Sequence, residues 1–306
     1  MKNNILLSSI ILIVSSILFS CNHIQDSKFH QLKGPYLGQN PPGMIPEIFA
    51  PGIVTTDQHE HSRITFSNNG TEMFWSVIPV DSNYKVTDGR PFKPHEQNIW
   101  YSMITNEDCT KPAIWEITRI SGGGSPAFSS QGDTFYYRSR KPDADPNIRP
   151  RSSQLWKVSY EGGEWGESLP ENNLIPQQEG KTFMSFCFSE NGNLYFDYGA
   201  PDQTGEWLWD IYFSEFKGDV YLKPVKMGNG INDGETSWCP WIAPDESYII
   251  YSSHREGEFG HGDLYINFKN DKGKWSDPIN LGRSVNTDMQ ERFPSVSPDG
   301  KYLFFC

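Results

Sequence analysis

Hydrophobic and polar positions repeat along the chain in one pattern: a short apolar strand, a turn, and a second strand rich in Tyr, Ile and Phe. Two clear copies run over 236–251 and 290–305, and they align so that Pro240 matches Pro294 and Asp245 matches Asp299. The turn of the second copy, Pro298-Asp299-Gly300, supplies a fixed φ and then a position suited to positive φ. Each copy therefore predicts a β-hairpin.

Three earlier segments carry the same pattern. Their hairpins are expected over 63–76, 125–137 and 186–196. The five turns are centred on positions 70, 132, 192, 246 and 300, so successive turns are separated by nearly equal lengths of chain. Self-similarity at a nearly constant period is the signature of a repeat architecture.

A second pair of strands is expected after each of the first four hairpins. These pairs are 99–102 with 113–117, 154–158 with 165, 209–213 with 220–224, and 263–266 with 275–281. Four strands in every repeat of this period predict the blades of a β-propeller, in an all-β fold. The hairpins predict five blades, with six as the alternative if the polypeptide extends further. A β-sandwich would require the repeated spacing to be coincidental.

The N-terminal part of the propeller is expected to close the ring. The segment 47–54 has the pattern of a strand, and 48–52 aligns with 278–282. The offset of this alignment is the same as the offset that takes Gly70 to Gly300. We therefore expect the N-terminal strand to be the outermost strand of the last blade, an arrangement that removes free sheet edges.

The N-terminal segment 1–20 has the pattern of an export signal. Lys2 precedes an uncharged apolar run that ends in Leu18-Phe19-Ser20-Cys21. This ending resembles the lipobox of bacterial lipoproteins, which implies that Cys21 carries the lipid. The alternatives are an ordinary signal peptide or a membrane anchor with a chance cysteine. The predicted organisation is a signal peptide (1–20), a polar tether (21–33) and a propeller (34–306), lipid-anchored in the cell envelope on the periplasmic or outer-membrane surface.

Composition narrows the class of partner. Aromatic residues make up 14% of the chain, which also has 22 Pro and 27 Gly, as expected for many short strands joined by turns. A formal net charge of −12 argues against a nucleic-acid partner, because such binding needs a basic face. The remaining cysteines have the spacing of neither a zinc motif nor a disulfide framework. Cys187 and Cys239 alternate with aromatic residues and are expected to be buried.

Propeller topology predicts where a ligand would bind. The first strand of each blade ends at the tight turn, so the loops between strands two and three gather on the opposite face with the crossovers between blades. We call this face the mouth. Charged side chains that converge there are the default ligand site. The candidates are His59, His61, Arg140, Lys141, Glu235, His254, Arg255, Glu291 and Arg292.

Two pairs among these candidates suggest specific chemistry. His59 and His61 are at positions i and i+2, so on an extended segment both imidazoles point the same way and could share a metal ion. The alternative is a polar loop with solvated histidines, since no third ligand can be named. Arg140-Lys141 and His254-Arg255 occupy equivalent places in two blades. They could bind a carboxylate or phosphate, or pair with Glu235 or Glu291 in a structural ring.

The tryptophans invite two interpretations. They could stack on sugar rings, but their positions within strands favour packing between blades. The residues concerned are Trp75, Trp100, Trp115, Trp156, Trp209 and Trp275.

The segment 294–304 resembles the repeat of TolB-type propellers. The longer stretch 252–264, with 274–282 and Val285-Asn-Thr, looks like the propellers of Bacteroidetes-type envelope lipoproteins, some of which are joined to OmpA-like peptidoglycan-binding domains. The resemblance is strong over 236–306 and diffuse before. It implies a periplasmic or surface module for binding or scaffolding. His254 and His261 depart from the Asn or Gly usual in the motif, and the family supplies no catalytic residues to transfer.

These observations favour a non-catalytic module that binds an envelope protein or glycan, contacts the membrane through its lipid anchor alone and uses no cofactor. The chain has no Gly-x-Ser-x-Gly elbow and no Walker loop. Two alternatives stay open. The first is an oligosaccharide-active enzyme, either a glycoside hydrolase or a metal-dependent lyase, with its site at the mouth. The second is a subunit of an export or motility machine.

Overall fold

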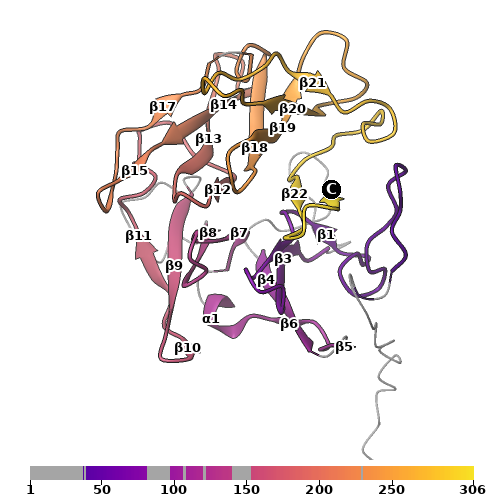
Figure 1. Cartoon of the computed structure of the whole chain (residues 1–306), viewed down its shortest axis with the longest axis vertical. Helices are drawn as coiled ribbons and strands as arrows, with labels where there is room; N and C mark the ends of the chain where they lie inside the picture. Colours follow the sequence, from indigo (N-terminus) through magenta and orange to yellow (C-terminus); the bar gives the residue numbers. More distant parts are fainter. Residues whose placement is uncertain are drawn as a thin grey trace, which may run out of the picture. The chain divides into compact units, whose positions relative to one another are not determined.

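The structure is a computed structural model that describes residues 37, 39–80, 97–105, 108–119, 122–139, 153–228 and 230–306. Within these ranges the fold is almost entirely β (Figure 1). The single turn of helix α1 (Glu116–Arg119) lies after the outer strands of the first sheet. In the described part of the chain no helix has the length and apolar character needed to cross a bilayer.

The first two sheets follow the predicted repeats. Blade 1 consists of β1 (His59–Glu60), β2 (Thr65–Phe66), β3 (Glu72–Ile78), β4 (Asn98–Thr105), β5 (Asp108–Cys109) and β6 (Ala113–Ile114). Its inner strand is split into the two short strands β1 and β2, and both pair with β3. Blade 2 has the path β7-β8-β9, with two short strands paired to β9; the strands are β7 (Gly124–Phe128), β8 (Thr134–Ser139), β9 (Gln154–Glu161), β10 (Glu164–Trp165) and β11 (Leu169–Glu171). All of these pairings are antiparallel.

The next two sheets each have four strands in simple order. Blade 3 consists of β12 (Phe186–Phe188), β13 (Leu194–Pro201), β14 (Trp207–Ser214) and β17 (Val225–Lys226). A two-stranded ribbon, β15 (Phe216–Lys217) with β16 (Val220–Tyr221), extends from its β14–β17 connection. Blade 4 consists of β18 (Thr236–Ile242), β19 (Tyr248–His254), β20 (Asp263–Phe268) and β21 (Ile279–Asn280).

A fifth hairpin follows, formed by β22 (Ser295–Val296) and β23 (Leu303–Phe304). It lies beside the first blade, where the Phe304 ring packs 5.6 Å from the Phe66 ring of β2 (Figure 1). The inner strands β7, β12 and β18 contact one another in sequence order. Four sheets of four or more antiparallel strands, arranged around their inner strands, confirm the predicted all-β propeller; the hairpin occupies the fifth position.

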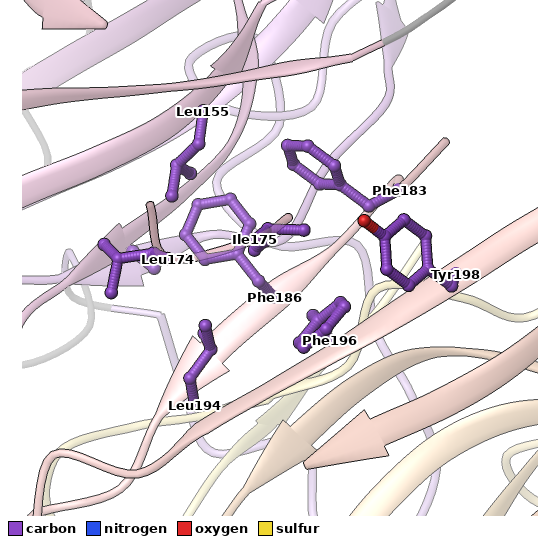
Figure 2. Close-up of a cluster of buried hydrophobic side chains, with 9 residues drawn as sticks. Leu155, Leu174, Ile175, Phe183, Phe186, Leu194, Phe196 and Tyr198 are labelled. Carbon is purple, nitrogen blue, oxygen red and sulfur yellow. The ribbon is translucent and has the colours of Figure 1, made fainter. Parts of the chain in front are cut away.

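The apolar cores lie between neighbouring blades. One cluster joins blades 1 and 2 through residues such as Phe74 and Phe135. Another joins blades 2 and 3, where Leu155 and Phe186 point toward each other with Phe196 alongside (Figure 2). A third joins blades 3 and 4. Because blades 2 and 3 bury both faces against their neighbours, their strands are rich in aromatic residues on both sides.

The predicted N-terminal strand over 47–54 does not form. Ala50 and Gly52 have φ of 43° and 78°, and the chain reverses there with hydrogen bonds such as Gly52 N to Thr55 O at 2.7 Å. The segment nevertheless contacts the fifth hairpin, because the Phe49 ring lies 4.9 Å from the Phe304 ring. It meets the last repeat through side chains rather than as a paired strand.

Two outer strands also differ from expectation. The strand expected over 113–117 ends at Ile114, since α1 begins at Glu116. The strand expected over 220–224 is divided: β16 folds back on β15, and β17 takes the outer position. The cause is Gly218-Asp219, whose φ values of 58° and 64° form a two-residue turn of the kind that closes tight hairpins.

The cysteines behave as expected. Cys187 and Cys239 are buried, and the four cysteines in the described residues are free thiols. Burial raises the pKa of both buried thiols, which favours their inert, protonated form.

Candidate functional site

The mouth is the face that receives the second-to-third-strand loops and the crossovers between blades. In blades 3 and 4 its loops are the β13–β14 and β19–β20 connections, and its crossovers run over 227–236 and 281–292. Most of the corresponding loops of blades 1 and 2 fall outside the described residues. Arg140 and Lys141 are among them, so their predicted role in anion binding stays a prediction.

The two histidines of blade 1 lie side by side. The ring centroids of His59 and His61 are 5.3 Å apart, and the His61 ring meets the Phe293 ring edge-on at 5.2 Å. The His61 backbone is fixed by Ser76 and Gln97, at 3.2 and 2.9 Å. Within the described ranges, no group of three or more His, Cys, Asp or Glu side chains is placed to hold a metal ion. The shared metal stays a hypothesis based on two ligands.

His254 occupies the end of β19, where the chain enters the mouth loop of blade 4. Its Nδ1 lies 3.1 Å from Glu258 Oε1, and its ring lies 5.1 Å from the Trp238 ring. The carboxylate of Glu258 orients the imidazole ring. His254 is thus a fixed, partly exposed group at the mouth.

Arg255 has a structural role. Its Nη2 donates to the carbonyl oxygens of Gly230 and Ile231 at 2.7 and 2.8 Å, and its guanidinium lies over the Tyr265 ring at 5.1 Å. These contacts fasten the crossover from blade 3 to blade 4 onto β19. Among the described residues Arg255 forms no ion pair with the predicted partners Glu235 or Glu291, and its Nη2 donates to backbone carbonyls instead.

Glu291 is buried in the crossover that leads to the fifth hairpin. Its backbone N–H donates to Gly262 O at 3.0 Å, and its Oε1 accepts from Thr287 Oγ1 at 2.5 Å. Its Oε2 is buried and has no hydrogen-bond partner among the described residues. The next residue, Arg292, pairs through its backbone with Cys306 and lies over the Phe293 ring. Glu235 is exposed.

Two buried ionisable side chains, Arg63 and Asp197, link the inner strands and are not among the residues selected from the sequence. The Nη2 of Arg63, in blade 1, donates to Ser185 Oγ in blade 3 and to Pro240 O in blade 4, the latter at 2.7 Å. Asp197 Oδ1 accepts from Met184 N and Ser185 N at 2.6 and 2.9 Å. Its Oδ2 accepts from the Cys239 N–H of blade 4 at 2.9 Å.

The signal for this axial network is the equivalence of positions in the repeats. Arg63, Ser125, Ser185, Cys239 and Phe293 occupy the same place in five inner strands. Ser125, Cys239 and Phe293 have φ of 54°, 52° and 55°, each before a proline. At Ser125 and Cys239 the pairing of β7 with β8 and of β18 with β19 shifts register. The bulge exposes backbone groups toward the axis, where the polar side chains bind them.

An aromatic row crosses the mouth from blade 3 to blade 4. We define it as Trp207, Trp209, Trp238 and His254. The Trp207 and Trp209 rings stack at 5.4 Å, and Trp209 packs against the cluster that contains Trp238. Sequence reasoning assigned Trp209 to packing between blades and did not select Trp207 or Trp238. Trp75 and Trp115 are 2% and 6% exposed, and Trp115 belongs to the cluster between blades 1 and 2, which confirms the packing interpretation for Trp115.

Comparison with known proteins adds likenesses of architecture. No family model matches the sequence, and no curated protein matches it either. TolB from Acinetobacter baumannii superposes with a TM-score of 0.48 and 13% identity, over 82% of this chain and 49% of that protein. The Hadza microbial sialidase Hz136 gives a TM-score of 0.43 and 14% identity, over 75% and 47%. A gluconolactonase from Xanthomonas campestris gives 0.40 and 10%, over 65% and 56%.

The chain spans about half the length of the first two of these proteins. Propeller folds carry many unrelated activities, so the likenesses do not transfer a function. The sheets of this chain establish its fold. The side chains at the mouth are the features that bear on its function.

Proposed function

We propose that the chain is a lipid-anchored propeller of the bacterial cell envelope that binds a protein or an envelope polymer at its mouth without turning it over. The envelope location is supported by the apolar run and Leu18-Phe19-Ser20-Cys21, which lie outside the described residues. A lipid on Cys21 would tether the propeller to the membrane surface through the polar segment 22–33.

The observation that carries the proposal is the fixed arrangement of side chains at the mouth. His254 is held by Glu258, and Glu291 is held by Thr287 and Gly262. His61 lies against Phe293, which brings blade 1 and the fifth hairpin together. Side chains that are already ordered lose little conformational entropy when a partner binds, which favours binding.

The proposal is tested by a melting-temperature screen of the full-length chain in mild detergent. The panel holds peptidoglycan fragments, acidic and neutral oligosaccharides, and divalent metal ions. A ligand that binds the native state at a hundredfold excess over its Kd should stabilise it by about 2.7 kcal/mol. We expect the shift to be lost in His254→Ala and kept in Lys272→Ala, an exposed residue of the β20–β21 loop.

A shift of the same size in both variants would place the ligand away from the mouth and contradict the proposal. Absence of a shift across the panel would direct the search to a protein partner, by crosslinking in cells with wild type and His254→Ala. Capture that is independent of His254 and of its mouth neighbours would also count against the proposal.

One observation favours the alternative of an oligosaccharide-active enzyme. The buried Oε2 of Glu291 has no hydrogen-bond partner among the described residues, and an unsatisfied buried carboxylate oxygen is a feature that occurs at catalytic sites. If the chain were a glycoside hydrolase, the purified protein would cleave oligosaccharides and Glu291→Gln would abolish the cleavage. No cleavage by wild type across the same panel would remove this alternative.

A further inference from the structure

Trp207 and Trp209 form a stacked pair at the start of β14. They are at positions i and i+2 of an extended strand, so both indoles lie on the same face of the sheet. Their ring centroids are 5.4 Å apart, with an interplanar angle of 23°. Both side chains are partly exposed. The pair therefore presents indole surface at the mouth instead of burying it completely between blades.

The backbone around Trp209 holds this pair in place. Thr236 Oγ1 accepts from Trp209 N at 2.6 Å and donates to Trp209 O at 3.2 Å, which fastens β14 to the first residue of β18. Gly199 is the cross-strand partner of Trp209. A Cβ on Gly199 would lie 2.4 Å from the Trp209 ring, so the indole rests directly on the glycine backbone. The absence of a side chain at Gly199 is what lets the ring lie against β13.

The aromatic row continues into blade 4. Trp238 is buried, and Trp209 packs on the cluster to which Trp238 belongs. The His254 ring lies 5.1 Å from the Trp238 ring. Gly262, at φ 121°, lies against the Trp238 ring in the same way that Gly199 lies against Trp209. Two blades thus contribute to one row of aromatic groups.

Acidic residues adjoin the row in the sequence, and one of them contacts it. Exposed Glu206 precedes Trp207, and its carbonyl oxygen accepts from Asp202 N at 2.8 Å, which closes the loop. Exposed Glu235 precedes Thr236, and Glu258 binds His254. In Arg255, the cation that follows His254, Nη2 donates to two backbone carbonyls. The surroundings offer hydrogen-bond acceptors and negative charge.

We propose that Trp207 and Trp209 are a stacking platform for a neutral saccharide chain, whose hydroxyl groups donate to the neighbouring glutamates. The apolar face of a pyranose ring matches the flat surface of an indole, and its hydroxyls suit carboxylate acceptors. An anionic polymer would be repelled by the same carboxylates. This inference rests on the proposed function, because it names the class of polymer that the mouth binds.

The test is isothermal titration of the full-length chain in mild detergent with cellotetraose, and with tetragalacturonate as the acidic counterpart. We expect cellotetraose to bind and to change tryptophan fluorescence, and tetragalacturonate to bind more weakly. Trp207→Ala should weaken cellotetraose binding about tenfold, as expected for the loss of one stacking contact, and Trp207→Phe should keep most of the affinity. The matched control is Trp241→Ala, which removes a partly exposed tryptophan that packs on Tyr248 near the opposite face.

Three results of the affinity measurements would overturn the inference. They are cellotetraose affinity unchanged in Trp207→Ala, tighter binding of tetragalacturonate than of cellotetraose, and an equal loss of affinity in Trp241→Ala. If neither saccharide binds while crosslinking captures a protein in a manner that depends on His254, the platform is wrong and the proposed binding function stands. Cleavage of cellotetraose by wild type, with affinity dependent on Trp207, would support the platform and contradict a non-catalytic function.

Discussion

At the scale of single residues, Glu246 shows how a departure from the repeat is compensated. The other four turns have glycine at this position, whereas Glu246 adopts φ 61° with a side chain attached. Its carboxylate accepts from Asn193 at 2.5 Å and from Lys269 at 2.8 Å, which joins blade 3 to blade 4. Burial by itself raises the pKa of Glu246, but the hydrogen bonds outweigh it and hold the pKa below its ordinary value.

This lowered pKa predicts a dependence of stability on pH. The ionised carboxylate stabilises the folded chain above the ordinary pKa of a glutamate, and that stabilisation is lost as pH falls through the lower pKa of the folded state. We expect Glu246→Gln to cost about 1 kcal/mol at pH 7 and to flatten the decline in stability below pH 5. Urea unfolding at several pH values measures this. Glu190→Gln, an exposed neighbour, is the control, and identical profiles for the two variants would contradict the prediction.

At the scale of elements, the inner strands are held by groups that satisfy their bulges. Asp197 of β13 binds backbone N–H groups that precede β12 and one within β18. Burial raises the pKa of Asp197 despite these three bonds. Its effect therefore has the opposite sign to that of Glu246: as pH rises through the raised pKa, ionisation of Asp197 reduces the stability of the fold.

Replacement of Asp197 by Asn should loosen the bulge at Cys239 and the segment that leads into β12. The amide can still accept hydrogen bonds at one end, but its NH₂ group would face the Cys239 N–H, which leaves a buried donor without an acceptor. We expect Asp197→Asn to lower the free energy of unfolding by about 2 kcal/mol, measured in urea at neutral pH. The matched control is Asp210→Asn, which breaks the partly exposed pair with Lys226 and should cost less than about 1 kcal/mol. Equal losses in the two variants would contradict a special role for Asp197.

Inner hairpins were more predictable than outer strands. The inner pairs alternate apolar residues around a fixed turn, so the register follows from Gly132 or Gly192. The outer strand of a blade is whichever short segment pairs with the edge of the sheet. Gly218-Asp219 diverts β16 into a separate ribbon, and the turn at Ala50 prevents a strand over 47–54. Such choices depend on local φ values that the apolar pattern does not report.

At the scale of the whole molecule, Arg63 connects blades that are not adjacent in the chain. Its guanidinium extends from blade 1 to Ser185 in blade 3 and to the Pro240 carbonyl in blade 4. It is 3% exposed, and its removal would leave the buried Pro240 carbonyl and the Ser185 hydroxyl without this hydrogen-bond donor. The axial region is therefore stabilised by a long-range polar contact as well as by the cores between blades.

Loss of this contact should destabilise the propeller as a unit. We expect Arg63→Met, which keeps most of the volume, to reduce the free energy of unfolding by about 3 kcal/mol, as for a broken buried polar network. Urea unfolding followed by tryptophan fluorescence gives the value. Arg119→Met removes a side chain that is 57% exposed and serves as the control. A loss below about 1 kcal/mol for Arg63→Met would show that the axial contact is dispensable.

The sequence predicts which face of the propeller forms the mouth, but it identifies only some of the side chains that lie there. Topology alone places His61, His254 and Glu291 on one face, and the i, i+2 spacing of His59 and His61 predicts their proximity. Arg255 donates hydrogen bonds to the Gly230 and Ile231 carbonyls because of the way in which the crossover folds back. The spacing of residues in the sequence does not encode that path. The i, i+2 spacing of Trp207 and Trp209 was a readable signal of a shared face.

The contact between Phe49 and Phe304 has a mechanical consequence. The segment that enters blade 1 from the N-terminal side is the one that packs against the last hairpin. Tension applied to the N-terminal side must therefore pass through this seam before it reaches a hydrogen-bonded strand of blade 1. The propeller therefore bears the force first at an aromatic contact that has no paired strands. Under force we expect the propeller to open between its first and last repeats while the blades remain folded.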